Sequence, residues 1–378
     1  MPGLLPDVDP DGLLEYSVVF SDRALNHMSR RFQRVMNDIS RTLKHVYRAH
    51  AVAIVPGSGT FGMEAVARQF ATGRTCLVIR NGWFSYRWTQ IFDAGSIPSR
   101  SLVMKATRTE SGTPAPYSPA ALETVLATVR AERPELVFAP HVETASGILL
   151  PDAYLRAVAD AVHAVGGMFV LDCIASGALW VDMQATGVDV LISAPQKGWS
   201  SSACCALVML NERARAAAEE TASTSFACDL RKWLQIMDAY EKGGHAYYAT
   251  MPTDSLARLR DMMKGLEAFG FDRAKAAQQQ LGDKVRRMLA GKGVASVAAT
   301  GFQAPSVIVG HTDDREIQSG AKLLDLGLQT AAGVPLQCDE PPEFRTFRIG
   351  LFGLDKLRNI DRTVAHLDTA FSQLTAEV

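Results

Sequence analysis

The most regular feature of the sequence is a series of short apolar runs that do not alternate with polar residues. Strands that are apolar on both faces are typical of a parallel or mixed sheet covered by helices on both sides. We therefore predict an α/β fold with a mostly parallel, seven-stranded sheet sandwiched by helices. The runs cover residues 51–55, 75–79, 101–106, 135–141, 167–172, 189–194 and 204–210.

Helical patterns separate these runs. Apolar residues recur at mixed steps of three and four, which is the spacing that places them on one face of a helix. The helices predicted in this part of the chain cover residues 30–46, 61–71, 84–92, 120–132 and 152–165. The alternation of strand and helix is what a parallel sheet requires, because each parallel strand needs a crossover connection.

The regular alternation of strand and helix patterns ends at about residue 253. Two long helical patterns lead into a segment with a few further strands and helices, which we interpret as a second, smaller α/β domain. The long helices are expected over 253–269 and 271–291, the strands near 306–310 and 344–351, and the remaining helices near 314–326 and 354–376. The predicted division is an N-terminal arm over 1–20, a large domain over 21–252 and a small domain over 253–378.

Composition excludes several classes of protein. The chain has 378 residues, 47% of them hydrophobic, and a formal net charge of −1, so charge gives no reason to expect nucleic acid or an anionic membrane as a partner. The first residues lack an apolar signal core, and no apolar stretch reaches the ~18 residues that suggest a membrane span. The six cysteines form no Cys-x-x-Cys pair. We interpret them as reduced, mostly buried thiols of a cytoplasmic protein. His45 and His50 lack a partner cluster, so we predict no metal site.

Lys197 and Asp172 are the first candidates for chemistry. Lys197 lies in a short loop between two apolar strands, where burying a lysine is costly unless it is paired or neutral. Asp172 ends the strand GMFVLD, at the sheet edge where open α/β folds bind ligands. Together they suit pyridoxal phosphate, since a lysine forms a Schiff base and a carboxylate pairs with the protonated ring nitrogen. An exposed turn for Lys197 and a helix N-cap for Asp172 are the alternatives.

The segment PGSGTFGMEA (56–65) follows a predicted strand and opens a helix. Its backbone N–H groups and the hydroxyls of Ser58 and Thr60 could hold a phosphate at the positive end of the helix dipole. The same segment contains a Gly-x-Gly-x-x-Gly pattern, and the next strand ends in Arg80. This combination leaves open an NADP-binding site or a plain tight turn.

Two further segments offer polar side chains. HVETASG (141–147) brings Thr144 and Ser146 to the same sheet edge, together with His141, which is equally well explained as a structural histidine. Arg348 lies on a predicted strand of the small domain among apolar neighbours. An inward arginine there is a natural bidentate partner for a substrate carboxylate, and a surface arginine on an edge strand is the alternative.

Taken in order, these segments resemble the class V, fold type I aminotransferases, close to the alanine–glyoxylate and serine–glyoxylate group. The resemblance covers nearly the whole chain, and the order and spacing of its motifs are more specific than any one of them. The motifs are GSGTFGMEA, NGWFSYRW (81–88), HVETASG, VLDCIASG (170–177), APQKGWSS (194–201), YYATMP (247–252) and FRIGLFG (347–353).

The resemblance implies a role for each candidate residue. Lys197 would carry pyridoxal 5′-phosphate and shuttle protons, Asp172 would hold the pyridine nitrogen, and Arg348 would bind the substrate α-carboxylate. The other implied cofactor contacts are Ser58, Gly59, Thr60 and Gln196 at the phosphate, Ile174 beneath the ring, Phe84 (or Trp83) stacked on its other face, and Thr144 at the ring hydroxyl or substrate. Tyr247 and Thr250 would reach the phosphate of a neighbouring subunit, so the resemblance implies a homodimer with shared sites.

The chain also departs from the family pattern. The early loop is replaced by LLPDVDPDGLLEYSVVFSDRALNHMS, and Met28 stands where many relatives have arginine. Both segments approach the substrate pocket in the family. Cys338 lies ten residues before Arg348, in a region where some related cysteine desulfurases place their nucleophile. Its surroundings, PLQCDEPPEF, differ from theirs, and we interpret Cys338 as a non-catalytic loop residue.

The function predicted from the sequence is amino-group transfer by a ping-pong mechanism. Alanine or serine would donate the amino group, and glyoxylate or pyruvate would accept it. One alternative keeps the cofactor but makes the enzyme a lyase, desulfurase or decarboxylase. A second is an NADP-dependent reductase built on Gly57, Gly59, Gly62 and Arg80, and a third is a cofactor-free interaction protein.

Overall fold

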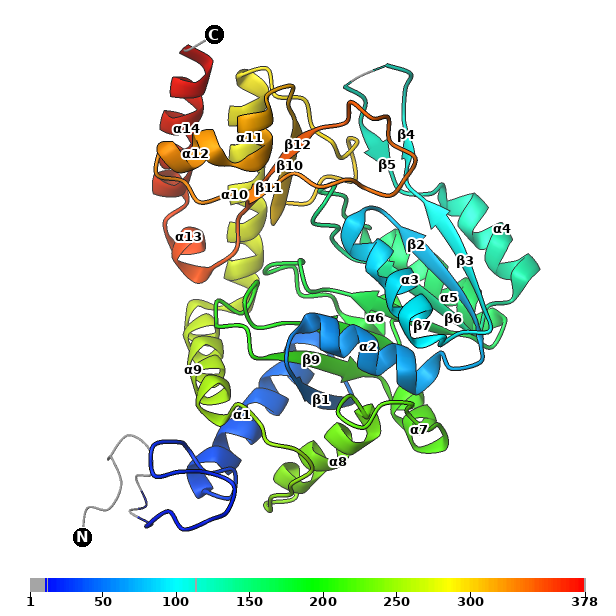
Figure 1. Cartoon of the computed structure of the whole chain (residues 1–378), viewed down its shortest axis with the longest axis vertical. Coiled ribbons are helices and arrows are strands. Elements are labelled where there is room, and N and C mark those ends of the chain that lie inside the picture. Colours follow the sequence, from blue (N-terminus) through cyan, green and yellow to red (C-terminus); the bar gives the residue numbers. More distant parts are fainter. Residues whose placement is uncertain (1–10, 12, 113, 377–378) are drawn as a thin grey trace.

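A computed structural model describes residues 11, 13–112 and 114–376 of the chain (Figure 1). Its helices are α1 (Arg30–Tyr47), α2 (Gly59–Phe70), α3 (Trp83–Gly95), α4 (Leu122–Glu132), α5 (Asp152–Ala164), α6 (Met183–Thr186), α7 (Glu212–Glu220), α8 (Leu230–Glu241), α9 (Thr253–Phe269), α10 (Phe271–Gly291), α11 (Arg315–Ser319), α12 (Ala321–Asp325), α13 (Leu354–Arg358) and α14 (Ile360–Ala376). Of the predicted N-terminal arm, residues 1–10 and 12 lie outside the described residues, and residues 13–20 form neither helix nor strand.

The predicted seven-stranded sheet is present. Its order is β1-β9-β8-β7-β6-β2-β3, and β9 is antiparallel to both of its neighbours, whereas the remaining pairs are parallel. The strands are β1 (Ala51–Pro56), β2 (Thr75–Arg80), β3 (Arg100–Lys105), β6 (Leu136–Pro140), β7 (Met168–Asp172), β8 (Val190–Ser193) and β9 (Cys205–Leu210). The carboxyl ends of β1, β6, β7 and β8 therefore lie along one edge, and the segments that follow them share that edge.

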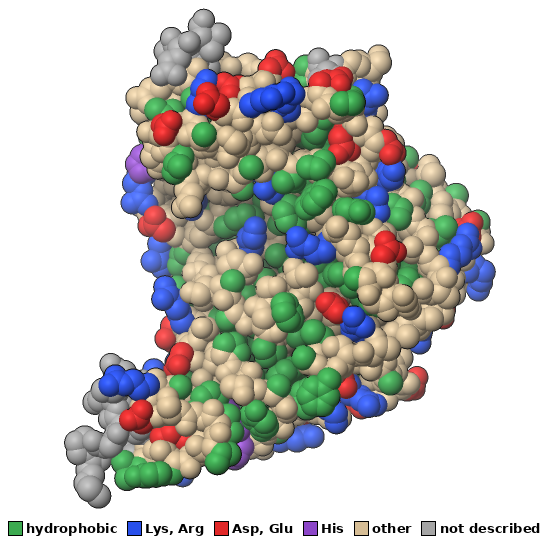
Figure 2. Space-filling model, in the orientation of Figure 1, with side chains coloured by type: hydrophobic (Ala, Val, Ile, Leu, Met, Phe, Trp, Pro, Cys, Tyr) green, Lys and Arg blue, Asp and Glu red, His purple; other side chains and the backbone are tan. Residues whose placement is uncertain are grey.

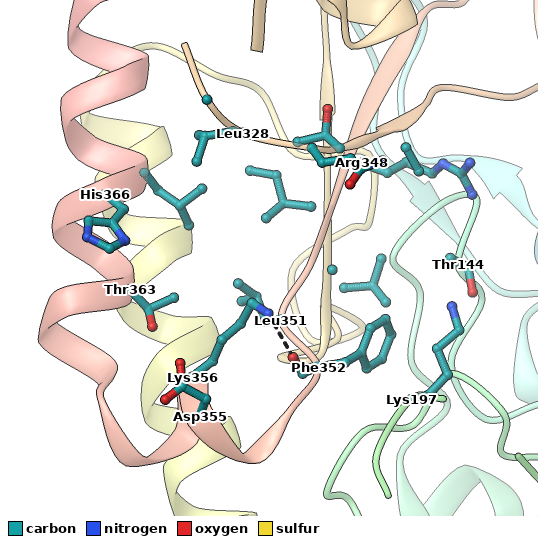
Figure 3. A pocket seen from close by; sticks show the side chains of 18 of the residues that line it. Thr144, Lys197, Leu328, Arg348, Leu351, Phe352, Asp355, Lys356, Thr363 and His366 are labelled. Carbon is teal, nitrogen blue, oxygen red and sulfur yellow. Dashed lines mark hydrogen bonds between the residues drawn. The ribbon is translucent and has the colours of Figure 1, made fainter. Parts of the chain in front are cut away.

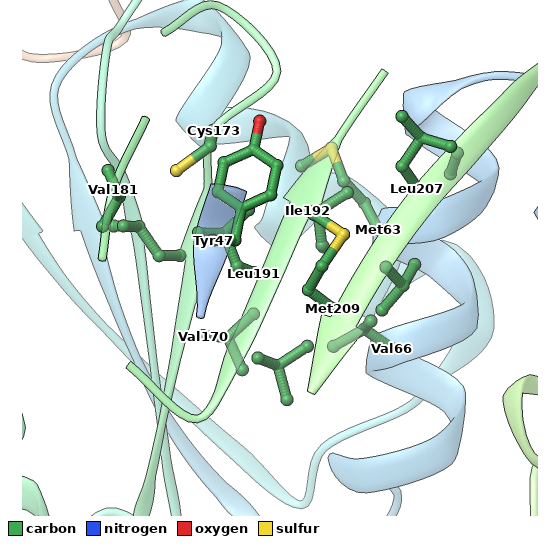
Figure 4. Close-up of a cluster of buried hydrophobic side chains, with 14 of the residues drawn as sticks. Tyr47, Met63, Val66, Val170, Cys173, Val181, Leu191, Ile192, Leu207 and Met209 are labelled. Carbon is green, nitrogen blue, oxygen red and sulfur yellow. The ribbon is translucent and has the colours of Figure 1, made fainter. Parts of the chain in front are cut away.

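Helices cover the sheet closely enough to bury it. Helix α2 packs on β9, β8 and β1, and α3 packs on β2 and β6, with α5 against β7. A Cβ atom on Gly62 would lie 2.4 Å from the Cβ of Ala206, so the glycine allows α2 to approach the sheet. Figure 4 shows part of the resulting core, where Met63 and Val66 of α2 lie near Ile192, Leu207 and Met209 of the strands. This packing fixes the start of α2 relative to the ends of β7 and β8.

A smaller antiparallel sheet follows in the last part of the chain. Strand β12 (Thr346–Gly350) lies between β10 (Val307–His311) and the short β11 (Ala331–Ala332). Helices α10 and α14 pack on each other, and α10 contacts β10. The Phe347 ring of β12 lies 5.4 Å from the Phe371 ring of α14. The fold class is thus confirmed. The domain boundaries stay a prediction, because α9 packs on α1 of the large part while α10 packs in the small part.

Some predicted elements differ from the structure. The single helix expected over 314–326 is wrong, because Gly320 adopts a φ of +88° and separates α11 from α12. The helix expected over 354–376 is divided at Asn359, between α13 and α14. A short hairpin of β4 (Thr107–Arg108) and β5 (Tyr117–Ser118) was not predicted. None of the described helices is both long and apolar enough to cross a membrane.

Candidate active site

A cavity of about 220 Å³ lies at the carboxyl edge of the large sheet. It collects side chains from the ends of β1, β6, β7 and β8 and from the starts of α2 and α3. Nine of the predicted site residues line it: Ser58, Gly59, Thr60, Phe84, Thr144, Asp172, Ile174, Gln196 and Lys197. The cavity is lined in addition by Met63, Arg87, Pro140, Val142 and Ala175. Segments far apart in the sequence therefore meet in one small enclosure.

Lys197 follows β8 and extends its side chain into this cavity. Within the described residues its Nζ has no hydrogen-bond or ion-pair partner, and it lies 4.6 Å from the centroid of the Phe352 ring. Burial lowers the pKa of Lys197, and the nearby Arg348 guanidinium lowers it further, whereas the Asp172 carboxylate opposes the shift. The neutral amine, which is the nucleophilic form, therefore becomes more accessible near neutral pH.

Asp172 is the last residue of β7 and is buried. Its Oδ1 accepts a hydrogen bond of 2.9 Å from the N–H of Ile174, and the residue lines the cavity. Burial raises the pKa of Asp172 to about 7, and Glu143 adds to the rise, while the Ile174 N–H, Arg87 and Lys197 oppose it. A cationic ring nitrogen placed beside this carboxylate would favour its charged form, so the group fits the pyridine end of the cofactor.

The start of α2 has the properties of a phosphate site. The N-cap Ser58 makes no side-chain capping hydrogen bond, so its hydroxyl is available to a ligand. The first N–H groups of the helix have no partner within the helix, as at any N-terminus. A Cβ on Gly59 would lie 2.4 Å from Cδ1 of Ile174, so a larger residue there would displace the Ile174 side chain, which also lines the cavity. The residues present therefore fit pyridoxal phosphate at both its ring and its phosphate end.

Two charged residues of the site were missed by the sequence reasoning. Arg87 lines the cavity and donates from Nη1 to Oγ1 of Thr60 at 2.9 Å, at the phosphate end. Within the described residues Arg87 has no carboxylate partner at ion-pair distance. Its signal was its place in NGWFSYRW, one helical turn after Phe84.

The second missed residue is Glu143, which is fully buried. One oxygen accepts from the backbone N–H groups of Phe84 (3.2 Å) and Ala145 (3.0 Å). The other accepts from the N–H (2.9 Å) and the hydroxyl (2.6 Å) of Ser85. The carboxylate therefore fixes the first turn of α3, which carries Phe84 into the cavity, and it is attracted by the helix dipole. A glutamate between a predicted strand and TASG was its only signal in the sequence.

Arg348 reaches the site from β12 of the small sheet. Its Nε donates to the carbonyl of Ala332 at 2.8 Å, and its Cζ lies 5.5 Å from the centroid of the Phe84 ring. Within the described chain no carboxylate pairs with Arg348, so its two terminal nitrogens remain available to an anion. Burial lowers the pKa of Arg348, and Glu143 opposes the shift, so the guanidinium keeps its charge.

Arg348 lines a second cavity of about 580 Å³, which also includes Thr144 and Lys197. The two cavities thus meet at Thr144 and Lys197 (Figure 3). Figure 2 shows Lys and Arg side chains among hydrophobic ones near the middle of the face that it presents. The arrangement can hold a cofactor in the smaller cavity and a carboxylate-bearing substrate at its junction with the larger one.

Tyr247 and Thr250 do not reach the cofactor cavity of their own chain. Tyr247 is 53% exposed, and its hydroxyl lies 3.1 Å from that of Thr250. His141 and Ser146 also stay outside the cavity, since Nδ1 of His141 is hydrogen-bonded to Ser176 (2.7 Å) and the Ser146 hydroxyl donates to the Asn81 carbonyl. Burial lowers the pKa of His141 to about 3, so it is neutral and structural.

The structure also places Trp83, Arg80 and the six cysteines. Trp83 does not line the cavity, whereas Phe84 does, which favours Phe84 as the stacking residue. Arg80 is buried and donates to Thr89 Oγ1 (2.8 Å) and to the Gln337 carbonyl (3.3 Å), away from both cavities. All six cysteines are free and buried, as predicted.

A family model for class-V aminotransferases matches residues 14–333. The chain belongs to the class-V aminotransferases. It is thus an aminotransferase, and the family depends on pyridoxal phosphate, which decides against the reductase and the cofactor-free protein considered above.

Individual relatives of this aminotransferase are distant. The small subunit of a soluble hydrogenase from Synechococcus sp. is 24% identical over 93% of this chain and 88% of its own length. The L-aspartate–glyoxylate aminotransferase of Paracoccus denitrificans is 25% identical over 69% of this chain, and the match spans 64% of that relative, just under two thirds of its length. The solved alanine–glyoxylate aminotransferase of Nostoc sp. superposes with a TM-score of 0.73 at 19% identity, over 91% of this chain and 88% of that one, and it supports the fold.

Proposed function

We propose that this aminotransferase moves an amino group from an amino acid such as alanine or serine to glyoxylate or pyruvate by a ping-pong mechanism. One observation carries the proposal: Lys197 lines both cavities, while Asp172 lines the smaller one and Arg348 the larger one. A nucleophilic amine, a carboxylate for a ring nitrogen and an unpaired guanidinium are the groups that amino-acid chemistry with this cofactor requires.

Pyridoxal phosphate, when bound, acts as an electron sink for the bonds at the substrate Cα. We propose that Ser58, Gly59, Thr60 and Gln196 hold its phosphate, and that the Arg87 guanidinium joins them. Asp172 would hold the proton on the ring nitrogen, and Thr144 would contact the ring hydroxyl or the substrate. Phe84 and Ile174 would enclose the ring between them.

The chain's own residues account for substrate handling. Arg348 would bind the α-carboxylate with its two free nitrogens, in a site dry enough to strengthen the ion pair. This would place the donor Cα toward Lys197, whose neutral Nζ would take the proton from Cα and deliver it to C4′ of the cofactor. The lowered pKa of Lys197 suits this role, because a fully charged ammonium cannot accept a proton.

We also propose a homodimer with shared sites. Tyr247 and Thr250 lie outside their own cofactor cavity and both are exposed residues, so a second copy would have access to them. Sedimentation of the holoenzyme would test this assembly, and Tyr247→Phe should weaken cofactor binding only if the hydroxyl reaches a neighbouring site.

The decisive test of transamination follows the nitrogen atom. With ¹⁵N-alanine and glyoxylate, the enzyme should form ¹⁵N-glycine and pyruvate in equal amounts, with parallel double-reciprocal plots, and Lys197→Ala should form neither. Consumption of the amino acid with release of free ammonia, and no labelled glycine, would contradict the proposal and favour a lyase.

The desulfurase alternative depends on Cys338, and its surroundings do not support it. The thiol is buried and outside both cavities, and its Sγ lies 3.4 Å from the Arg80 carbonyl. Burial raises the pKa of Cys338 to about 12, with Glu143 adding to the rise. A protonated, enclosed thiol is a poor nucleophile. We therefore keep the interpretation of Cys338 as a non-catalytic residue.

A further inference from the structure

The larger cavity exceeds what alanine or serine needs. It measures about 580 Å³ and extends from Lys197 and Arg348 past Phe352 to the side of α14 (Figure 3). Cavities of roughly 300–1,000 Å³ hold ligands much larger than these two amino acids. Since the cavity is continuous with the reacting amine and with the carboxylate site, the extra space lies where a donor's side chain would extend.

The walls of this extra space combine a group of buried apolar side chains with the polar ones of Gln329, Thr330, Thr363 and His366. Val307, Ile349, Leu351 and Leu367 contribute to them and are each at most 7% exposed, so they form a firm, dehydrated surface. Leu328 faces them from the segment before β11 (Figure 3). A surface of this kind binds hydrocarbon, because contact with it removes apolar area from water.

The charged groups around the rim already have partners. Arg362 is ion-paired with Asp355 at 2.5 Å, and Lys356 donates from Nζ to the carbonyl of Phe352 at 3.0 Å. Arg362 and Asp355 lie at the exposed end of the cavity. Because the charges of this rim pair compensate each other, the pair gives no reason to expect an amino donor with an acidic side chain. Lys356 is the one rim cation without a carboxylate partner among the described residues. The competing hypothesis is therefore that Lys356 binds an acidic group at the far end of the donor's side chain.

Phe352 forms the boundary between the reacting centre and the apolar space. Its ring lies 4.6 Å from Nζ of Lys197, and in Figure 3 it lies between Lys197 and the part of the cavity beside Leu351. A side chain leaving the donor Cα would thus first contact an aromatic ring and then the leucine and isoleucine surface.

From this arrangement we infer that the preferred amino donor carries an apolar side chain larger than a methyl group. Branched aliphatic, thioether and aryl side chains belong to this class. The inference rests on the proposed function, since it takes Arg348 to bind the α-carboxylate and Lys197 to act at Cα. It extends that function by assigning the apolar part of the larger cavity to the donor's side chain.

The first experiment compares donors with the wild-type holoenzyme. Values of kcat/KM are measured for alanine, leucine, methionine, phenylalanine and glutamate with one acceptor. Each buried methylene contributes about fourfold, so the best apolar donor should exceed alanine by ~10-fold or more. Alanine equal to or better than all apolar donors would overturn the inference. Glutamate as the best donor, with its advantage lost in Lys356→Met, would overturn it in favour of a distal anion.

A pair of matched variants tests the location. Leu328→Trp adds bulk inside the cavity, whereas Leu324→Trp adds the same bulk at an exposed position of α12 outside it. The leucine-to-alanine ratio of kcat/KM should fall ~10-fold in Leu328→Trp and stay unchanged in Leu324→Trp. Thr363→Phe, which enters the cavity from α14, provides a second filling variant if Leu328→Trp does not fold. An unchanged ratio in a folded filling variant contradicts the assignment.

A binding measurement separates this inference from the proposed function. Calorimetry compares 4-methyl-2-oxopentanoate with pyruvate, two 2-oxo acids that need no amino transfer to bind. The branched acid should bind ~10-fold more tightly, and Leu328→Trp should remove that preference. If this holds while no amino acid donates nitrogen, the cavity assignment stands and the proposed function fails. Equal binding of the two acids overturns the cavity assignment, whatever the enzyme's reaction.

Discussion

Glu143→Gln is the sharpest perturbation that the site offers, because it removes one charge and almost no volume. The wild-type carboxylate accepts four hydrogen bonds, two on each oxygen, from Phe84, Ser85 and Ala145. The amide keeps one accepting oxygen and turns an NH₂ group toward N–H donors. In one orientation the Ser85 N–H loses its acceptor, and in the other the Phe84 and Ala145 N–H groups lose theirs.

The expected cost follows from these contacts. A hydrogen bond to a charged group contributes about 1.5–3 kcal/mol, and a buried N–H left without a partner costs about 1–3 kcal/mol. The Ser85 hydroxyl can rotate and donate elsewhere, so we count the loss of one backbone partner plus the weakened remaining bonds. The free energy of unfolding of the apoenzyme should therefore fall by about 2–4 kcal/mol.

Urea unfolding of the apoenzyme, followed by tryptophan fluorescence, measures this change, since the fully buried Trp88 lies on the helix that Glu143 anchors. Glu64→Gln is the matched control, because the Glu64 side chain is 39% exposed and its carboxylate pairs with Arg68, so the change should alter stability by less than about 1 kcal/mol. A loss of less than about 0.5 kcal/mol in Glu143→Gln, roughly the scatter among surface substitutions, would show that the carboxylate does not anchor α3.

Three further predictions concern the cofactor and substrate sites. Asp172→Asn should stabilise the apoenzyme above pH 7 by up to about 4 kcal/mol. The pKa of Asp172 is raised to about 7 in the folded state, so the wild-type apoenzyme loses stability as the pH rises from about 4 to 7. In urea titrations below pH 4 the difference between variant and wild type should vanish. Gly59→Ala should raise the dissociation constant for pyridoxal phosphate by ~10-fold in fluorescence titrations, because the new Cβ would lie 2.4 Å from Cδ1 of Ile174. Adding Ile174→Val to this variant should restore part of the affinity. If neither change alters the affinity as expected, the packing of Gly59 against Ile174 does not control cofactor binding. Arg348→Lys should raise KM for 2-oxo acids by ~10-fold or more, since one ammonium cannot replace a bidentate guanidinium, and an unchanged KM would exclude Arg348 from carboxylate binding.

The sequence predicted the large sheet well because its strands are buried on both faces and read as uninterrupted apolar runs. Helices α9 and α10 were found with the observed bounds, because their apolar periodicity is long. The break at Gly320 was missed because a glycine within a helical pattern does not say whether it will adopt a positive φ. Helices α7 and α8 were not predicted, and the hairpin of β4 and β5 is too short to give a period.

The candidate site was predictable where a motif ends a strand. Asp172, Lys197 and the start of α2 each follow an apolar run, so topology alone brings them to one edge. Arg87 and Glu143 were missed for a different reason: their roles depend on contacts with Thr60 and with the first turn of α3, which no spacing in the sequence specifies. The size of the larger cavity was equally out of reach, since it depends on how the small sheet sits against α14.

Chemical reduction followed by peptide mapping shows which residue carries the cofactor. The holoenzyme is treated with borohydride, digested and examined by mass spectrometry for the peptide that retains the pyridoxyl group. We expect a label on Lys197, and none in Lys197→Arg prepared in the same way. A label on any other lysine of the wild-type protein, or no label on a protein that has bound the cofactor, would contradict it.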